Sequence, residues 1–193
     1  SLRKQLLGKR VALLGHPASI TSDLQHSLDA LIKCSDLQIA SAFGPQHGMR
    51  GEKQDNMVET EDYLDSLYKI PVFSLYGEVR RPTDKMLDSF DVLLIDLQDV
   101  GTRIYTFLTT LLYVLEAAAA KNKSVWVLDR PNPAGRPVEG SLLKNGWVSF
   151  VGASHFPMRH GMTLGECALW FQKIHRINVD LKVIALEGYD PVQ

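Results

Sequence analysis

The chain has few cysteines, almost no excess charge and no long apolar run. Cys34 and Cys167 are its only cysteines, neither lies in a Cys-x-x-Cys motif, and we expect both to be free thiols buried on helices. The formal net charge of -1 gives no electrostatic reason to bind nucleic acid or an anionic membrane surface. No apolar stretch is long enough to span a bilayer. We therefore expect neither a nucleic-acid nor a membrane partner.

Several sequence signatures are also missing. The turn after the first apolar run, 15–19, is not a Gly-x-Gly-x-x-Gly fingerprint, and no Walker Lys-Ser/Thr pair occurs, which argues against a nucleotide cofactor. No Gly-x-Ser-x-Gly elbow is present for a serine hydrolase. His-x-x-x-His spacing is absent too, so no metal is expected at His16, His47, His155 or His160. The first ten residues lack a signal-peptide apolar core, which leaves the compartment undecided between cytoplasm and export.

Short apolar runs alternate with segments of helical pattern. The composition, 45% hydrophobic and 22% charged, is typical of one globular domain. Six runs predict strands: 11–14, 37–43, 71–75, 92–95, 125–128 and 181–186. The helices are predicted from a capping box at Ser22 and Gln25 through Ile32, over 60–68, after Thr83, over 104–120, and from a capping box at Thr163 and Glu166. This alternation predicts an α/β fold with a mostly parallel sheet of about five to six strands.

Polar residues gather after the predicted strands. Because parallel strands end at one edge of a sheet, the loops after residues 14, 43, 75, 95 and 128 should meet there. Four of these loops are rich in polar groups: 46–55, 78–81, 96–103 and 129–132. The loop 44–56 is broken by three glycines and a proline, and long irregular loops are usually functional or disordered. The sequence therefore predicts a ligand site at this edge.

The residue types at this edge suit acid/base chemistry on a sugar, which needs paired carboxylates. The candidate carboxylates are Glu52, Asp55, Glu78, Asp96, Asp99, Asp129 and Glu139. Arg50, Arg103 and Arg130 could hold an anionic group by a bidentate fork, and Tyr76 and Tyr105 could stack on a sugar. Each of these residues could instead have a structural role. Asp96 and Asp129 could cap loops, Arg103 could pair with Asp99, and Tyr105 could belong to the core. Glu166 is expected to cap its helix.

Five segments, in order, resemble the exo-β-N-acetylmuramidase family (NamZ-like glycoside hydrolases, formerly a family of unknown function). They are 43–52, 96–106, 128–133, 138–140 and 159–166. The resemblance implies a Rossmann-like three-layer sandwich with its site in a cleft at the loop edge. It also implies removal of N-acetylmuramic acid from non-reducing ends of peptidoglycan fragments, with arginines binding the lactyl carboxylate.

The chain departs from this family in two ways. Gln46 stands where the commonest family motif, Pro-Glu-His-Gly, has glutamate, and an amide cannot transfer a proton as a carboxyl group does. Family members are also about twice as long, with a C-terminal domain that walls the cleft. The resemblance therefore predicts that residues 1–193 are the N-terminal catalytic domain of a longer chain.

We thus predict a glycosidase domain that binds a small sugar or muropeptide without a cofactor or metal. Glu52 or Glu78 is predicted as general acid, and Asp96 or Asp99 as the orienting carboxylate. The predicted binding residues are Gln46, His47, Arg50, Gln98, Arg103, Tyr105, Asp129, Arg130 and Asn132. A non-catalytic sugar-binding protein and a hydrolase of another glycan remain open as alternatives, as does the oligomeric state.

Overall fold

A seven-stranded sheet with the order β3-β4-β2-β1-β5-β6-β7 forms the centre of the computed structural model, which describes residues 2–51, 59 and 61–190. The strands are β1 (Arg10–Gly15), β2 (Gln38–Gly44), β3 (Tyr63–Leu64), β4 (Pro71–Ser74), β5 (Val92–Asp96), β6 (Ser124–Leu128) and β7 (Asp180–Ile184). Only the edge strand β3 runs antiparallel to its neighbour. The predicted parallel sheet is confirmed, with one short strand more than expected.

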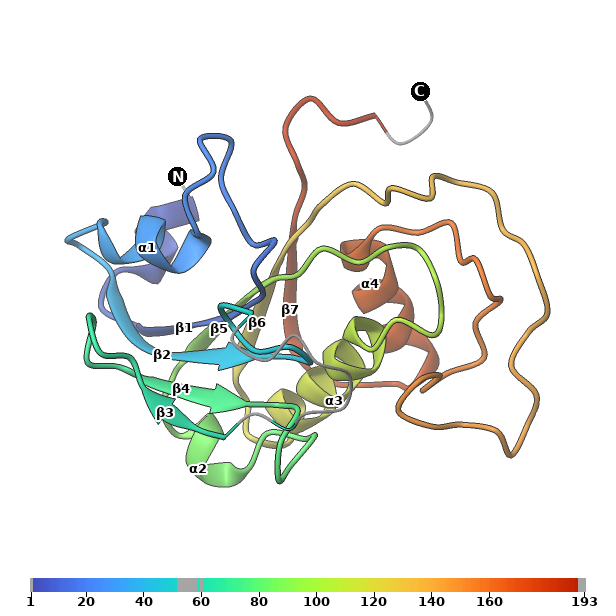
Figure 1. Cartoon of the computed structure of the whole chain (residues 1–193), viewed down its shortest axis with the longest axis horizontal. Helices are drawn as coiled ribbons and strands as arrows, with labels where there is room; N and C mark the ends of the chain where they lie inside the picture. Colours follow the sequence, from blue (N-terminus) through green and yellow to red (C-terminus); the bar gives the residue numbers. More distant parts are fainter. Residues whose placement is uncertain (1, 52–58, 60, 191–193) are drawn as a thin grey trace.

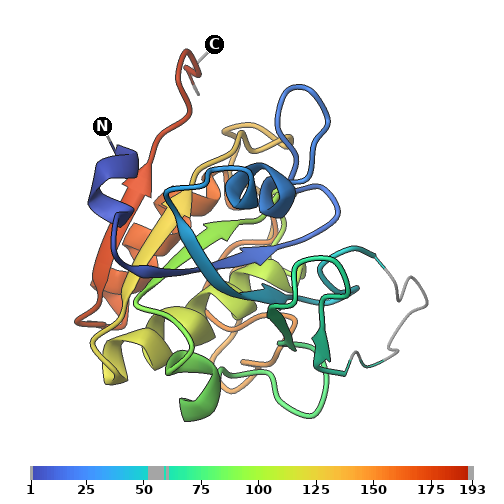
Figure 2. The same ribbon diagram turned by 90° about the vertical axis from the view of Figure 1, so that its left-hand side faces the viewer.

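Helices cover both faces of the sheet (Figures 1 and 2). One face carries the short 3-10 helix η1 (Leu2–Leu6) and α1 (Ser27–Ile32). The other carries α2 (Asp84–Leu87), α3 (Phe107–Ala120) and α4 (Leu164–Ile174). The expected three-layer arrangement is therefore present. Among the described residues, no helix combines the length and apolar character needed to cross a bilayer.

The side chains of β5 show why this strand is central. Val92 and Leu94 pack into the core beneath α1, whereas Leu93 and Ile95 pack against α3 and α4. All four are at most 2% exposed. A strand buried on both faces needs an unbroken apolar run, which is the pattern that predicted it.

The β1–β5 boundary is the topological switch point of the sheet. From β1 the chain moves outward through β2 and β4, and it returns to β5 on the other side of β1. The helices that follow β1 and β5, α1 and α3, lie on opposite faces. Their departure in opposite directions opens a crevice at the carboxyl ends of β1 and β5, the place where open α/β sheets bind ligands.

The start of α1 differs from the prediction. The helix begins at Ser27, and the Nδ1 atom of its N-cap, His26, accepts a hydrogen bond from the Leu28 amide at 3.2 Å. Leu24 has φ 62° and is 77% exposed. A residue in the left-handed region cannot continue a right-handed helix, so the capping box predicted at Ser22 and Gln25 is wrong.

The predicted helix over 60–68 is also wrong in its described part, where Tyr63 and Leu64 form β3. The Asp65 carboxylate then accepts hydrogen bonds from the amides of Leu67 at 2.9 Å and Tyr68 at 2.8 Å. This side-chain turn competes with a helix for the same amides. Thr60 lies outside the described residues.

Other helix limits need smaller corrections. The helix predicted over 104–120 begins only at Phe107, and Ile104 is 53% exposed. The two cysteines are free, but only Cys167 is buried on a helix, because the half-buried Cys34 follows the end of α1.

The predicted capping box of α4 is confirmed. The Thr163 hydroxyl accepts from the Glu166 amide at 3.2 Å, and the Glu166 carboxylate accepts from the Thr163 amide at 2.8 Å. Glu166 also pairs with Arg136 at 2.6 Å, and this hydrogen bond lowers the pKa of the Glu166 carboxyl group.

Candidate functional site

A hollow of about 360 Å³ lies at the switch point, and we call it the switch-point hollow. It is lined by His16, Pro17, His47, Gly51 and Tyr105. These residues come from the loop after β1, the loop after β2 and the turn that precedes α3. The hollow therefore lies at the edge of the sheet where the sequence predicts a ligand site.

The loop after β1 holds His16 in one orientation. The Ser19 hydroxyl accepts a hydrogen bond from the His16 amide at 2.8 Å and donates a short one to the Asp96 carbonyl. The Ala18 amide donates to His16 Nδ1 at 3.3 Å. The imidazole lies edge-on to Phe107, with ring centroids 4.8 Å apart. His16 thus belongs to a turn that is joined both to β5 and to the start of α3.

His16 is neutral at physiological pH. Burial, with smaller contributions from the nearby His47 and His26, lowers the pKa of His16 from 6.5 to about 4. Desolvation and neighbouring positive charge both disfavour the imidazolium form.

We expect the stability of the protein to fall as the pH is lowered from 6.5 towards 4. In that range the unfolded chain binds a proton at position 16 that the folded chain does not, so acid favours unfolding. Because His16 is only partly buried, we expect the loss to be about 1–2 kcal/mol. Urea unfolding of the natural protein and of His16→Gln, each at pH 7 and at pH 4.5, measures this loss of unfolding free energy. An identical pH dependence in both would contradict the assignment to His16.

The loop after β2 is tightly folded as far as Gly51. A Cβ atom at Gly44 would lie 2.7 Å from the Met49 amide nitrogen, so this close approach requires glycine. His47 has φ 73°, an unusual value for a residue with a side chain. The Gln46 side chain is held at α3, where its Oε1 accepts from the Thr106 hydroxyl at 2.9 Å.

Arg50 is directed to α1. Its Nη1 and Nη2 donate to the two Asp29 oxygens, at 3.0 and 2.5 Å. The Tyr68 hydroxyl also donates to Asp29, at 3.0 Å. Arg50 is the largest cause of the lowered pKa of the Asp29 carboxyl group. These contacts fasten the loop to the body of the domain, and a contact of Arg50 with substrate remains a prediction. Glu52 and Asp55 lie outside the described residues.

Tyr105 forms the wall of the hollow nearest α3. Its ring packs edge-on against the ring of Phe107, and the two ring centroids are 4.6 Å apart. Burial and, to a lesser extent, Asp99 raise the pKa of the Tyr105 phenol. The hydroxyl therefore stays protonated, and within the described residues it makes no hydrogen bond. It can donate to a ligand in the hollow.

The buried Asp96 and the half-buried Arg130 form an ion pair beside a second hollow of about 500 Å³, which Asp129 also lines. The Asp96 oxygens accept from Arg130 Nε at 2.6 Å and Nη2 at 3.1 Å, and from the Ser27 hydroxyl at 2.5 Å. Arg130 also donates to the Ile20 carbonyl at 2.9 Å. These bonds join β5, β6 and α1, so both residues have a structural role.

Asp129 binds the first turn of α4. It accepts hydrogen bonds from the Gly165 amide at 2.8 Å and the Thr163 hydroxyl at 2.7 Å. A Cβ atom at position 165 would lie 2.8 Å from the Asp129 carboxyl carbon, so this contact requires a glycine there.

We expect Asp129→Ala to lower the free energy of unfolding by about 2 kcal/mol, because the Gly165 amide and the Thr163 hydroxyl lose their acceptor. Urea unfolding measures the change. Glu139→Ala is the matched control, since its carboxylate is 62% exposed in a pair with Arg159 and should contribute at most about 1 kcal/mol. Equal effects of the two substitutions would contradict the capping role.

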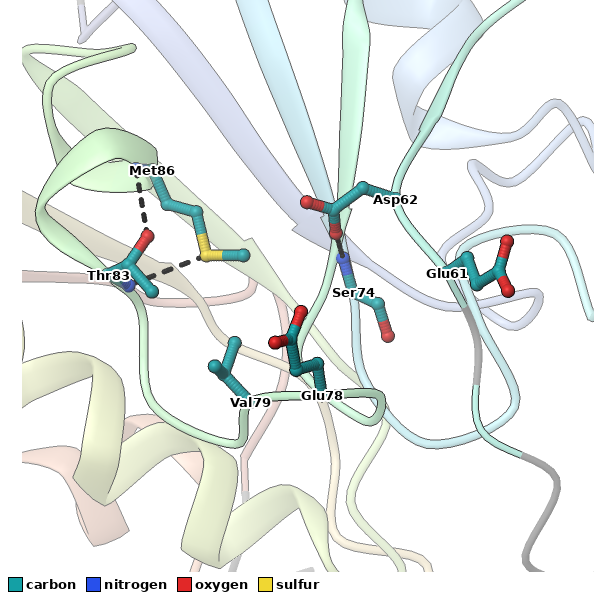
Figure 3. A pocket seen from close by; sticks show the side chains of 7 residues that line it. All are labelled: Glu61, Asp62, Ser74, Glu78, Val79, Thr83 and Met86. Atoms are coloured by element: carbon teal, nitrogen blue, oxygen red, sulfur yellow. Dashed lines mark hydrogen bonds between the residues drawn. The ribbon is translucent and has the colours of Figure 1, made fainter.

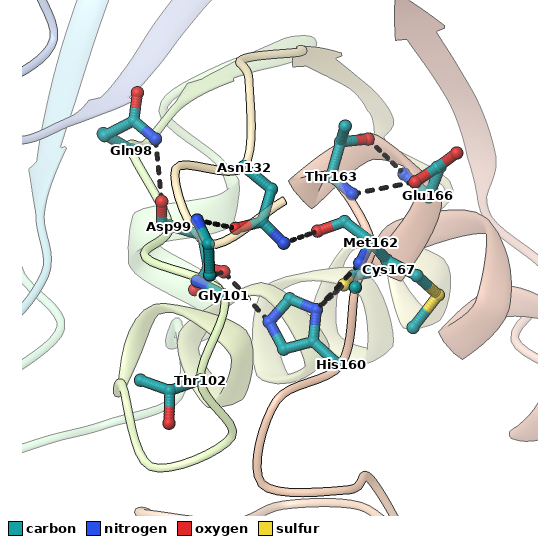
Figure 4. A network of polar contacts seen from close by, with 12 residues as sticks. Gln98, Asp99, Gly101, Thr102, Asn132, His160, Met162, Thr163, Glu166 and Cys167 are labelled. Carbon is teal, nitrogen blue, oxygen red and sulfur yellow. Dashed lines mark hydrogen bonds and ion pairs between the residues drawn. The ribbon is translucent and has the colours of Figure 1, made fainter. Parts of the chain in front are cut away.

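Gln98, Asp99 and Asn132 belong to an internal network (Figure 4). Gln98 donates to the carbonyls of Asp99 at 2.7 Å and Pro131 at 2.9 Å. Asn132 bridges the Met162 carbonyl, at 3.0 Å, and the Ala134 amide, at 2.9 Å. The side chains thereby connect the loop after β5 to the loops after β6 and before α4.

In the same network Asp99 contacts the fully buried His160. Because the Met162 amide donates to His160 Nδ1 at 3.3 Å, Nε2 is the ring nitrogen that donates to Asp99, at 3.1 Å. Cys167 Sγ lies 3.8 Å from His160 Nδ1. The order Cys-His-Asp resembles a nucleophilic triad, but the thiol is 0% exposed and burial raises its pKa. The cysteine is therefore a core residue.

Arg103 stabilises the long irregular stretch that precedes α4. Its Nη1 donates to the carbonyls of Ser141 at 2.8 Å and Phe156 at 2.6 Å. No ion pair joins it to Asp99 in the described structure. Arg103 also lines a separate hollow of about 450 Å³ with Trp147 and Val151.

Glu78 lies in another hollow, of about 320 Å³, with Glu61 and Asp62 (Figure 3). Its side chain is exposed. The Asp62 carboxylate accepts from the Ser74 amide at 2.8 Å. Tyr76, considered for sugar stacking, is 7% exposed and covered by the Arg80 guanidinium 3.9 Å above its ring.

The structure thus divides the predicted site residues among several places. His47 and Tyr105 line the switch-point hollow, and Gln46 is bound to Thr106, the residue after Tyr105. Asp96, Asp129 and Arg130 meet at the second hollow. Gln98, Asp99 and Asn132 form the internal network. Arg50, Arg103 and Glu78 lie apart from these groups. His16 was not predicted as a binding residue, although its position directly after the first strand is a signal that could have identified it.

Comparisons with known proteins agree over nearly the whole chain. The family described as exo-beta-N-acetylmuramidase NamZ, N-terminal, matches residues 11–193. The peptidoglycan beta-N-acetylmuramidase NamZ of Bacillus subtilis is 43% identical over 188 residues, which are 97% of this chain and 45% of that protein.

Two crystal structures of DUF1343 family proteins from Bacteroides fragilis have the same fold. One superposes with a TM-score of 0.89 at 36% identity, covering 99% of this chain and 48% of the other. The second superposes with a TM-score of 0.84 at 31% identity, covering 98% of this chain and 50% of the other. The chain spans about half the length of the relatives that it matches.

Proposed function

The chain belongs to the exo-β-N-acetylmuramidase NamZ family, and we propose that it forms the substrate-binding and catalytic part of a glycosidase acting on peptidoglycan fragments. The proposed reaction is hydrolysis of the bond that joins a terminal N-acetylmuramic acid to the next sugar. The substrate is inferred from the relative of Bacillus subtilis, whose name gives that sugar.

The observation that carries this proposal is the position and size of the switch-point hollow. It lies where α/β sheets bind ligands, and its volume of about 360 Å³ is near the lower end of the range of about 300–1,000 Å³ for small-molecule sites. A hollow of this size suits one sugar unit, as an enzyme that removes terminal sugars requires. The protonated Tyr105 hydroxyl and the His47 imidazole supply polar contacts.

We propose Glu52 as the general acid. Gly51, which lines the hollow, is the last described residue before Glu52 in the sequence. The alternatives are less suitable: Asp96 is bound to Arg130 and Ser27, Asp99 is 4% exposed, and Glu78 lines a different hollow. An acid must come within hydrogen-bonding distance of the leaving oxygen.

Gln46 favours one alternative, a sugar-binding protein without catalysis. Its carbonyl oxygen accepts from Thr106, and a carboxylate could accept the same bond, so Gln46→Glu should fold normally. If Gln46 replaces the only proton donor, the natural protein binds N-acetylmuramic acid without hydrolysis and Gln46→Glu gains activity. A hydrolase of another glycan is the other alternative.

Release of nitrophenol from para-nitrophenyl N-acetylmuramide by the complete natural protein tests the proposal. The N-acetylglucosaminide, which lacks the lactyl group, is the matched control substrate. We expect turnover of the muramide with a clear preference over the control. Preference for the control substrate would indicate a different glycan, and binding without turnover would support the non-catalytic alternative.

A further inference from the structure

His16 lines the switch-point hollow and carries a ring N–H group that is not used within the described structure. Its Nδ1 accepts from the Ala18 amide at 3.3 Å, so the proton of the neutral ring is on Nε2. Within the described residues, Nε2 has no hydrogen-bond partner, and His16 is one of the residues that line the hollow. A polar N–H group in a ligand-sized hollow is suited to meet a ligand.

This donor is held in place before any ligand arrives. The ring is edge-on to Phe107, which is 1% exposed. The turn that carries it is fixed through Ser19, a residue 0% exposed whose hydroxyl bonds the carbonyl of β5 residue Asp96. A pre-positioned side chain loses little conformational entropy on binding, so its hydrogen bond contributes more to affinity.

We propose that His16 is a substrate-binding residue whose Nε2–H donates to an uncharged oxygen of the amino sugar, a hydroxyl or the acetamido carbonyl. This inference rests on the proposed function and adds a contact to it. An uncharged donor suits an uncharged acceptor, whereas the lactyl carboxylate would favour a cation. The low pKa of His16, about 4, keeps this donor uncharged throughout the neutral pH range.

A pair of near-isosteric substitutions in the complete natural protein isolates the donor. His16→Gln places an amide N–H near the position of Nε2–H, and His16→Met fills similar space with no donor. Both lose the contact with Ala18 equally, so their comparison removes its effect. With para-nitrophenyl N-acetylmuramide we expect KM to rise about tenfold in His16→Met and less than about threefold in His16→Gln. The value of kcat should change little in either variant.

The outcomes separate this inference from the proposed function. If the natural protein is active and the two variants have equal KM values, the proposed role of His16 is overturned and the proposed function is not. A fall in kcat of about a hundredfold in both, with loss of one limb of the pH profile, would also overturn it by making His16 an acid or base. A natural protein that neither hydrolyses nor binds the muramide would overturn the proposed function and this inference together.

Nuclear magnetic resonance of the imidazole nitrogens gives a second, independent measurement. In the natural protein we expect His16 to show the Nε2–H form, and its Nε2 resonance to move when N-acetylmuramic acid is added. His175, whose Nε2 contacts Ser154 at 3.1 Å, is the internal control and should not move. An unmoved His16 resonance at saturating sugar would contradict the proposed contact.

Discussion

Asp96→Ala is expected to lower the free energy of unfolding by about 3–5 kcal/mol, a large part of the total stability of a domain. The Asp96 side chain is 4% exposed and that of its partner Arg130 is 22% exposed. Three donor atoms, two on Arg130 and one on Ser27, lose the Asp96 carboxylate together, and Arg130 Nη2 keeps only the Ile20 carbonyl. The main cost is the half-buried guanidinium group that remains without a counter-charge.

Urea unfolding of Asp96→Ala, Arg130→Met, the double variant and one control tests this account. The double variant Asp96→Ala/Arg130→Met should be less destabilised than the sum of the single variants, because it removes both charges. Asp36→Ala is the control, since Asp36 pairs with Arg3 and both side chains are more than 40% exposed. Such exposed pairs contribute at most about 1 kcal/mol. A loss below 1 kcal/mol for Asp96→Ala would show that this ion pair does not stabilise the fold.

Glu52→Gln should lower kcat on the muramide by about 10²- to 10⁴-fold, the usual contribution of a general acid. The amide has nearly the same size as the carboxyl group but cannot donate the required proton. Glu78→Gln is the matched control, because Glu78 is an exposed carboxylate in a different hollow, and we expect nearly natural kcat.

The reverse pattern, with a large loss only for Glu78→Gln, would transfer the acid role to Glu78. If the amide variants of Glu52, Glu78, Asp96 and Asp99 all keep natural turnover, the acid/base assignment is wrong. Unfolding curves of each variant distinguish lost chemistry from lost structure, which matters most at Asp96.

The parts of the fold that the sequence predicts well depend on local patterns. The unbroken run 92–95 indicated a strand buried on both faces, and the Thr163–Glu166 spacing indicated the start of α4. The same kind of signal at Ser22 and Gln25 was misleading. A capping box consists of two common residue types, and the left-handed Leu24 that prevents a helix there has no mark in the sequence.

The composition of the site was harder to predict, because it depends on contacts between distant residues. Arg50, predicted as a binding residue, pairs with Asp29, 21 positions earlier, a contact that the sequence does not indicate. Arg130 pairs with Asp96, 34 positions away. Strand order brings these groups to one edge, but only the three-dimensional structure shows which of them bind each other. His16, the binding residue proposed here, has no distinctive spacing to other residues, and its position directly after the first strand is the one signal that the sequence offers.

The measurement that tests the central claim most directly is digestion of a muropeptide-derived disaccharide with N-acetylmuramic acid at its non-reducing end. The complete natural protein and Glu52→Gln would be compared by mass spectrometry of the products. We predict that the natural protein releases free N-acetylmuramic acid and that Glu52→Gln leaves the disaccharide intact. An intact disaccharide after digestion by the natural protein, with no binding of N-acetylmuramic acid, would contradict the proposed function.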